Sequence, residues 1–174
     1  MAETPDTSPD ALAQTLDGLL LPLGGRTALA AQHFTGDKAA IHLRADEVFP
    51  AASLAKLPIA VELMRRIDLG QFSATERFDV SDEPRAGGDG VLDHLDPAIS
   101  LTLDDLCMLM LIVSDNTAAN FLLSLLGMGE INETMSRLKL TETRLARRFM
   151  DLAARAAHRE NTTAAGEMSV PVAL

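Results

Sequence analysis

The 174-residue chain has little aromatic character and cannot form an intrachain disulfide. It contains six Phe, no Trp and no Tyr, so Leu, Ala and Met must fill its interior. Its single cysteine, Cys107, lies in the apolar run 101–113, where we expect a buried, unreactive thiol. The length, with 47% hydrophobic and 23% charged residues, is enough for a soluble domain with its own core.

Clusters of Lys and Arg are also missing, and the net charge is −10. Such a chain offers no positive surface to a phosphate backbone, so nucleic-acid binding is not expected. The four histidines have no metal-ligand spacing. We therefore expect no metal and no cofactor.

Long apolar runs are absent as well. The apolar stretches are interrupted by charge or Pro and are too short to span a bilayer, which argues against a membrane partner. The first six residues have neither the basic region nor the apolar core of a secretory signal. As written, the sequence predicts a cytoplasmic protein.

Residues typical of helix caps and turns mark where helices and strands are expected in the rest of the chain. Ser8-Pro9-Asp10 predicts a helix start, and residues 26–34 and 39–44 read as a hairpin around Thr35-Gly-Asp-Lys38. Further helices are expected at 53–69, 103–113, 117–126 and 130–138, with a weaker one at 147–160. The apolar side of the first of these, expected to face the core, consists of Leu54, Leu57, Ala60, Val61 and Met64. Only two strands are evident, which leaves many helices without a sheet to cover.

Two short motifs carry the chemistry. In Ser53-Leu-Ala-Lys56 the serine and lysine are three residues apart on a predicted helix, so they share one face. A lysine in a dry pocket can act as the base that activates a serine hydroxyl. Ser114-Asp-Asn116 adds a hydroxyl that can relay a proton and an amide that can bind a substrate carbonyl.

Each motif alone has a simpler interpretation. Ser53 could merely cap a helix whose Lys56 faces solvent, and Ser-Asp-Asn is common at turns and helix starts. Against this, Lys56 is the only charged residue between Ser53 and Glu62. The Gly87-Gly-Asp-Gly90 segment, by contrast, lacks the preceding strand and the Lys-Ser/Thr of a phosphate-binding loop and reads as a plain turn.

Together the motifs resemble two of the three signatures of penicillin-recognising serine enzymes, S-x-x-K and S-D-N. The chain is similar to class A β-lactamases and related serine hydrolases from about residue 26 to 168. The resemblance implies an α/β sandwich with a helical lobe and an antiparallel sheet. It implies acyl transfer from a β-lactam, or a related amide or ester, to Ser53. Lys56 and Ser114 would move protons, Asn116 would bind the acyl-amide carbonyl, and Asp115 would hold the loop.

The chain also departs from that pattern. The third signature, K-T-G, is absent, and the C-terminal strands of the family fold are expected to be missing, as in a truncated chain. The family's E-x-x-L-N motif, with its deacylating Glu, aligns with Phe149 at the Glu position and Ala153 at the Asn position when Leu152 is shared. Asp151 is a nearby carboxylate but lies out of register.

Three hypotheses remain open from the sequence. The chain is a β-lactamase-like hydrolase, an inactive fragment of that fold, or a penicillin-binding or esterase-type enzyme that deacylates slowly. We expect residues 1–25 to form an N-terminal helical segment and residues 26–174 an incomplete catalytic domain. Family members are usually exported, whereas the sequence as written predicts a cytoplasmic protein. An incomplete sheet should leave apolar surface exposed and promote self-association.

Overall fold

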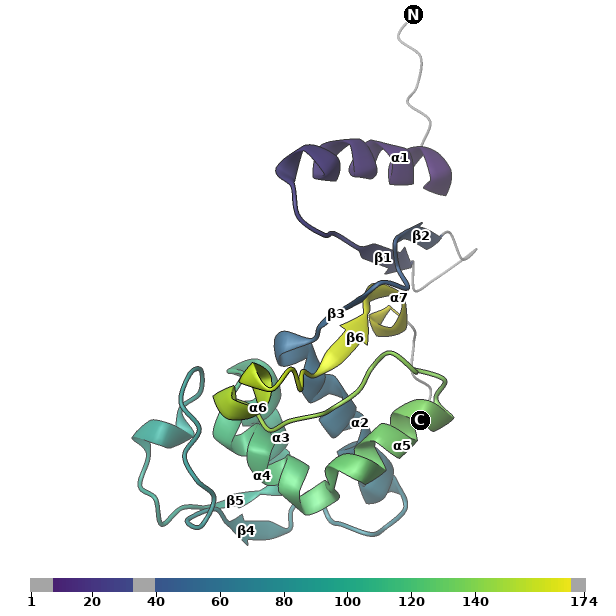
Figure 1. Cartoon of the computed structure of the whole chain (residues 1–174). Helices are drawn as coiled ribbons and strands as arrows, with labels where there is room; N and C mark the ends of the chain where they lie inside the picture. Colours follow the sequence, from purple (N-terminus) through teal and green to yellow (C-terminus); the bar gives the residue numbers. More distant parts are fainter. Residues whose placement is uncertain (1–7, 33–39, 170–174) are drawn as a thin grey trace, which may run out of the picture. The chain divides into compact units, whose positions relative to one another are not determined.

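The computed structural model describes residues 8–32 and 40–169 (Figure 1). They divide into two compact units, one made of the segment up to Phe49 together with the segment from Thr163, the other spanning Pro50–Thr162. The predicted hairpin turn Thr35–Lys38 and the last five residues lie outside the described residues. The domain division expected after residue 25 stays a prediction.

The first unit is built on a helix and a hairpin. Helix α1 (Pro9–Leu20) begins at Ser8, whose side chain accepts a hydrogen bond from Ala11 N, as the Ser-Pro signal predicts. It packs on strand β2 (Ala40–Leu43), which pairs antiparallel with β1 (Leu29–Gln32). Short helix α7 (Ala165–Met168) contacts β1.

Two further two-stranded sheets were not expected. β3 (Val48–Pro50) pairs with β6 (Thr162–Ala164), and the boundary between the units falls within both strands. β4 (Arg77–Asp79) pairs antiparallel with β5 (Ser100–Thr102). Each of these strands has three residues, too few for an alternating apolar pattern to show in the sequence.

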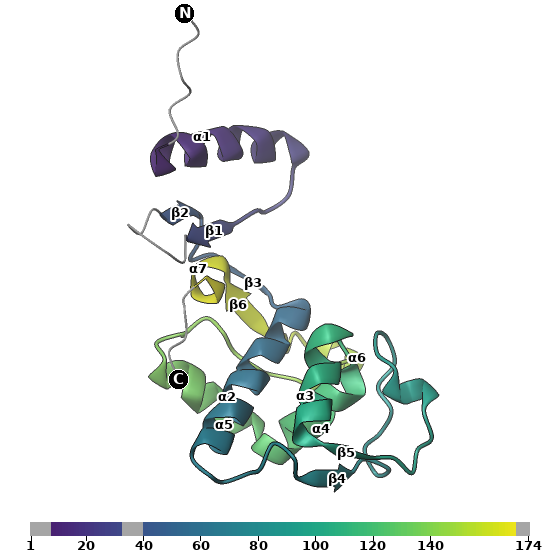
Figure 2. The ribbon, with the colours of Figure 1, turned by 180° about the vertical axis from the view of Figure 1, so that it is seen from behind.

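The second unit is mainly helical, with α2 (Lys56–Asp68) contacting three other helices (Figures 1 and 2). These are α3 (Leu103–Ile112), α4 (Asn116–Leu126) and α5 (Met128–Arg137). Thr102 and Asp105 form a capping box at the start of α3, and Gly70 follows α2 with a φ of 69°. The expected thiol is buried in α3, where burial and Asp104 raise the pKa of Cys107.

The buried side of α2 differs from the expectation. Leu54 and Leu57, assigned to the core from the sequence, are 49% and 41% exposed. The buried residues are instead Pro58, Ile59 and Leu63, together with the charged Lys56 and Glu62. The carboxylate of Glu62 accepts hydrogen bonds from Arg65, Arg66 and Thr134. A polar network is therefore buried on this side of α2, and the apolar pattern of the sequence did not predict it.

The helix expected at 147–160 is confined to α6 (Leu152–Ala156), which Asp151 caps. Asparagine side chains hold the preceding backbone instead: Asn120 Oδ1 accepts from Phe149 N, and Asn161 Oδ1 accepts from Ala146 N and Arg147 N. Those N–H groups are thereby satisfied without a helix. The broad helix prediction was wrong for most of this segment.

Candidate active site

The two predicted motifs meet at the start of α2. Ser53 lies in a short 3-10 helix (Ala52–Ala55), and its Oγ is 2.8 Å from Oγ of Ser114, 61 positions later in the chain. The residue before the serine, Ala52, has a φ of 47°, and Ser114 has a φ of 57°. A left-handed backbone at a residue other than Gly costs on the order of 1–3 kcal/mol, and such residues cluster at functional sites.

Lys56 is the buried centre of the site, with 2% of its surface exposed. Its Nζ donates to the backbone oxygen of Ser114, to Ser114 Oγ at 2.8 Å and to Asn116 Oδ1 at 2.9 Å. Burial lowers the pKa of Lys56 from its usual 10.5, while the charges of Asp115 and Asp89 act in the opposite direction. The amine is thus prepared to lose its proton more readily than a surface lysine.

The lysine reaches the first serine through the second one. Among the described residues no hydrogen bond joins Lys56 directly to Ser53, although both lie on the same turn. Ser114 Oγ contacts both Ser53 Oγ and Lys56 Nζ, so the three groups form a continuous chain. Ser53 does not cap a helix, and Lys56 does not face solvent, which removes the simpler interpretation of this motif.

Asp115 has the structural role expected for it. Its Oδ1 accepts from Ala118 N at the start of α4, and its Oδ2 accepts from Val91 N and Leu92 N. The carboxylate therefore ties the Ser-Asp-Asn turn to the 81–98 loop.

The glycine-rich segment that the sequence presents as a plain turn forms one wall of the site. Asn116 Nδ2 donates to the Gly87 carbonyl, and Asn116 N donates to the Asp89 carbonyl. Gly88 has a φ of 94°, and a Cβ there would lie 2.9 Å from Asn116 Nδ2. The signal was present in the sequence as glycines and an Asp, but nothing local shows what they pack against.

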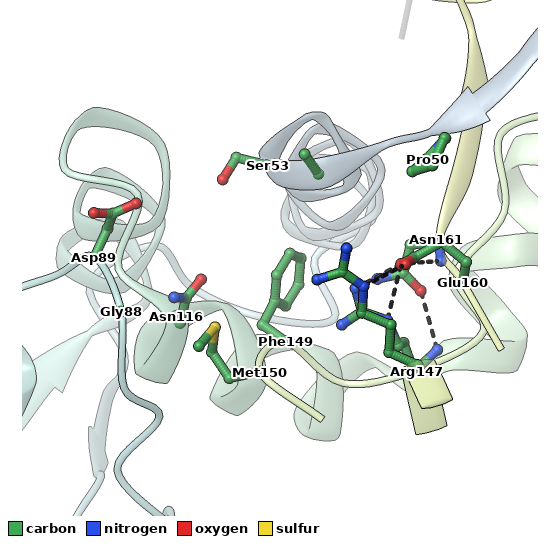
Figure 3. A pocket seen from close by; sticks show the side chains of 12 residues that line it. Pro50, Ser53, Gly88, Asp89, Asn116, Arg147, Phe149, Met150, Glu160 and Asn161 are labelled. Atoms are coloured by element: carbon green, nitrogen blue, oxygen red, sulfur yellow. Dashed lines mark hydrogen bonds and ion pairs between the residues drawn. The ribbon is translucent and has the colours of Figure 1, made fainter. Parts of the chain in front are cut away.

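Gly88, Asp89 and Asn116 line a pocket of about 280 Å³ together with Ser53 (Figure 3). The Ser53 hydroxyl points toward the wall that holds Asp89, Gly88 and Asn116, and Phe149 and Met150 form the floor, drawn below Ser53 in this view. The centre of the Phe149 ring is 5.0 Å from Lys56 Nζ. Phe149, which aligns with the Glu of the family's E-x-x-L-N motif, therefore lies beside the candidate catalytic lysine.

The opposite side of the pocket is an ion-pair group. Glu160 Oε1 accepts from Arg147 Nε at 2.9 Å, and Glu160 Oε2 lies 3.5 Å from Arg155 Nε. Both carboxylate oxygens of Glu160 are therefore engaged by guanidinium groups. Ser53 also borders a second pocket of about 480 Å³, whose apolar lining includes Leu54, Leu57 and Leu111.

In the described part of the chain, no group of three or more His, Cys, Asp or Glu could hold a metal ion. None of the helices there has the length and apolar character needed to cross a membrane.

Comparison with known proteins assigns the family. The model of the beta-lactamase enzyme family matches residues 11–171. A β-lactamase of Rhodobacter capsulatus is 30% identical over 163 residues, which cover 83% of this chain and 50% of that relative. The chain belongs to the beta-lactamase enzyme family.

Solved structures agree with this assignment and with the expected fold. An ancestral class A β-lactamase superposes with a TM-score of 0.77 at 29% identity, covering 90% of this chain and 60% of that one. A mutant of PBP-A, solved as an acyl-enzyme complex with penicillin G, gives a TM-score of 0.79 at 27% identity, covering 95% and 61%. The chain thus spans about half to three fifths of the length of these proteins.

Proposed function

We propose that Ser53 is the nucleophile of a serine β-lactamase-like hydrolase and is acylated by a β-lactam or a related amide or ester. The observation that carries the proposal is the hydrogen-bonded chain from Ser53 Oγ through Ser114 Oγ to the buried Lys56 Nζ. A serine hydroxyl needs such a base because it is a poor nucleophile on its own.

The proton transfers of this step balance among the side chains of Ser53, Ser114 and Lys56. Once Lys56 has lost one proton to solvent, Ser114 Oγ can donate to its Nζ. As Ser53 Oγ bonds to the lactam carbonyl carbon, its proton passes to Ser114 Oγ while the Ser114 proton passes to neutral Lys56 Nζ. When the lactam C–N bond breaks, the nitrogen takes a proton from Ser114, which regains one from Lys56. The product is a ring-opened ester on Ser53, with Lys56 neutral again.

Substrate orientation is assigned to Asn116. Its Oδ1 accepts from Lys56, and its Nδ2 donates to Gly87 with one of its two hydrogens. The other hydrogen is available for the acyl-amide carbonyl of a substrate. The backbone N–H of Ser53 would stabilise the developing oxyanion.

Release of the acyl group should be slow. On the pocket floor, the Phe149 ring lies 5.0 Å from Lys56 Nζ and cannot take a proton from water. Glu160 lies in the same pocket, but its oxygens are engaged by Arg147 and Arg155. This arrangement favours penicillin-binding behaviour, in which the adduct persists, over rapid turnover.

A fluorescent penicillin tests the assignment. We expect slow covalent labelling that Ser53→Ala abolishes and that Ser124→Ala leaves unchanged, since the Ser124 hydroxyl lies in α4 and bonds the Asn120 carbonyl. Labelling that persists in Ser53→Ala would be non-specific and would favour an inactive fragment.

Self-association is part of the same proposal. Leu54, Leu57, Leu111 and Ile112 are 41–71% exposed on α2, α3 and the turn before α2. Apolar surface of this kind drives association in water. Sedimentation at low and high protein concentration should show a larger species at the higher one, and a monomer throughout would contradict it.

A further inference from the structure

We propose that Asp89 is a specificity-determining residue that favours substrates whose acyl side chain carries a protonated amine. This inference rests on the proposed acylation of Ser53. It concerns the pocket wall formed by the glycine-rich segment. The hydrogen-bonded chain of Ser53, Ser114 and Lys56 is not involved.

The position of Asp89 is fixed by its neighbours. Its backbone oxygen accepts a hydrogen bond from Asn116 N, the residue assigned to the substrate amide. A Cβ at Gly90 would lie 2.5 Å from the Asp115 carboxyl group, so the next residue is packed directly on the Ser-Asp-Asn turn. Asp89 therefore lines the wall that faces Ser53, on a backbone that its neighbours hold in place (Figure 3).

The charges lining the pocket are unevenly compensated. Glu160 is engaged by Arg147 and Arg155 on the far side. No hydrogen bond or ion pair within the described segments engages the carboxylate of Asp89, which is exposed. Its charge nevertheless reaches the site, because it raises the pKa of Lys56 against the effect of burial.

The chemistry of the ligand follows from this geometry. If Asn116 binds the acyl-amide carbonyl, the substituent on that amide lies beside Gly88 and Asp89. A cation within a few ångströms of an exposed carboxylate gains the energy of a surface ion pair, which corresponds to about a two- to five-fold preference. A neutral substituent gains nothing from the same charge.

The test compares two penicillins that differ in this substituent. Ampicillin carries a primary amine on its acyl side chain, and penicillin G does not. The acylation rate constant of each is measured by competition with a fluorescent penicillin, at about pH 6 so that the amine is protonated. The proteins are the unmodified chain, Asp89→Asn and the control Asp93→Asn, which removes the same charge from an exposed position in the same loop.

We expect the ratio of ampicillin to penicillin G rates to fall about two- to five-fold in Asp89→Asn and to stay unchanged in Asp93→Asn. Salt at about 0.5 M should lower the ratio for the unmodified chain in the same direction. An unchanged ratio, or an equal loss for both penicillins, would overturn the role of Asp89. Failure of both penicillins to acylate the unmodified chain would overturn the proposed function itself, and this inference with it.

Discussion

The centre of the Phe149 ring lies 5.0 Å from Nζ of Lys56. A buried amine against an aromatic face is held by cation–π attraction when it is charged. In the sequence, Phe149 stands where the family resemblance places a water-activating Glu. The contact thus places an aromatic ring, which cannot take a proton from water, beside the candidate catalytic lysine.

Restoring a carboxylate at this position should speed release of the acyl group. In Phe149→Glu the new side chain can take a proton from water, which typically contributes two to four powers of ten to a rate. The measurement is the lifetime of the penicillin adduct after excess ligand is removed. Phe149→Gln is the matched control, because it removes the ring without adding a base. Equal lifetimes in the two variants would show that Phe149 is not the missing base position.

Acylation should depend on pH through Lys56. The lysine must be neutral to accept the proton, so the rate should rise with pH and level off at a pH below 10.5, because burial lowers the pKa of this amine. The measurement is the labelling rate from pH 6 upward, within the range in which circular dichroism is constant. Lys56→Ala should lose about two to four powers of ten, whereas the exposed Lys139→Ala should not change. A flat profile would remove Lys56 from the role of base.

Substitution by Ala in the Gly87–Gly90 segment should slow labelling at Gly88 and leave it unchanged at Gly87. In Gly88→Ala the new Cβ would lie 2.9 Å from Asn116 Nδ2, on a backbone with a φ of 94°. We expect labelling to slow by at least tenfold, with a loss of stability of about 1–3 kcal/mol. Gly87→Ala meets no atom within 4 Å and should behave like the unmodified chain. Equal effects in both variants would mean that the loop does not position Asn116.

Glu62 should make the fold sensitive to acid. Burial alone would raise its pKa, but hydrogen bonds from Arg65, Thr134 and Arg66 outweigh this and lower the pKa of Glu62 to about 2. The folded state then holds this proton less tightly than the unfolded chain does. Stability from Glu62 is complete above about pH 4.5 and is lost as the pH falls toward 2, in total on the order of 3 kcal/mol.

Urea unfolding between pH 5 and pH 3 measures this contribution. Glu62→Gln should be less stable at pH 5 and should lose less stability on acidification than the unmodified chain. Glu133→Gln, in an exposed pair with Arg137, is the control and should change little. Parallel pH curves for Glu62→Gln and the unmodified chain would contradict the account of this network.

Local chemistry made several features predictable from the sequence. The starts of α1, α3 and α4 follow from Ser8, Thr102 and Asp115, because a cap is satisfied within a few residues. The meeting of Ser53 with Ser114 was also expected, since both motifs are known to act as a pair.

Features set by distant contacts could not be predicted. The shape of the 147–161 segment depends on Asn120 and Asn161, which hold its backbone N–H groups from outside. The exposure of Leu54 and Leu57 depends on which side of α2 the other helices cover, and that side carries the buried Glu62, which accepts from Thr134 of α5. No periodicity in the sequence carries this information.

The most direct test of the account is the intact mass of the protein after incubation with penicillin G and removal of the excess. We expect a single, long-lived addition equal to the mass of the whole penicillin, because ring opening expels no atoms, and peptide mapping should place it on Ser53. The addition should be absent from Ser53→Ala and strongly delayed in Lys56→Ala. No adduct on the unmodified chain, or an adduct on another residue, would contradict the assignment of Ser53 as the nucleophile.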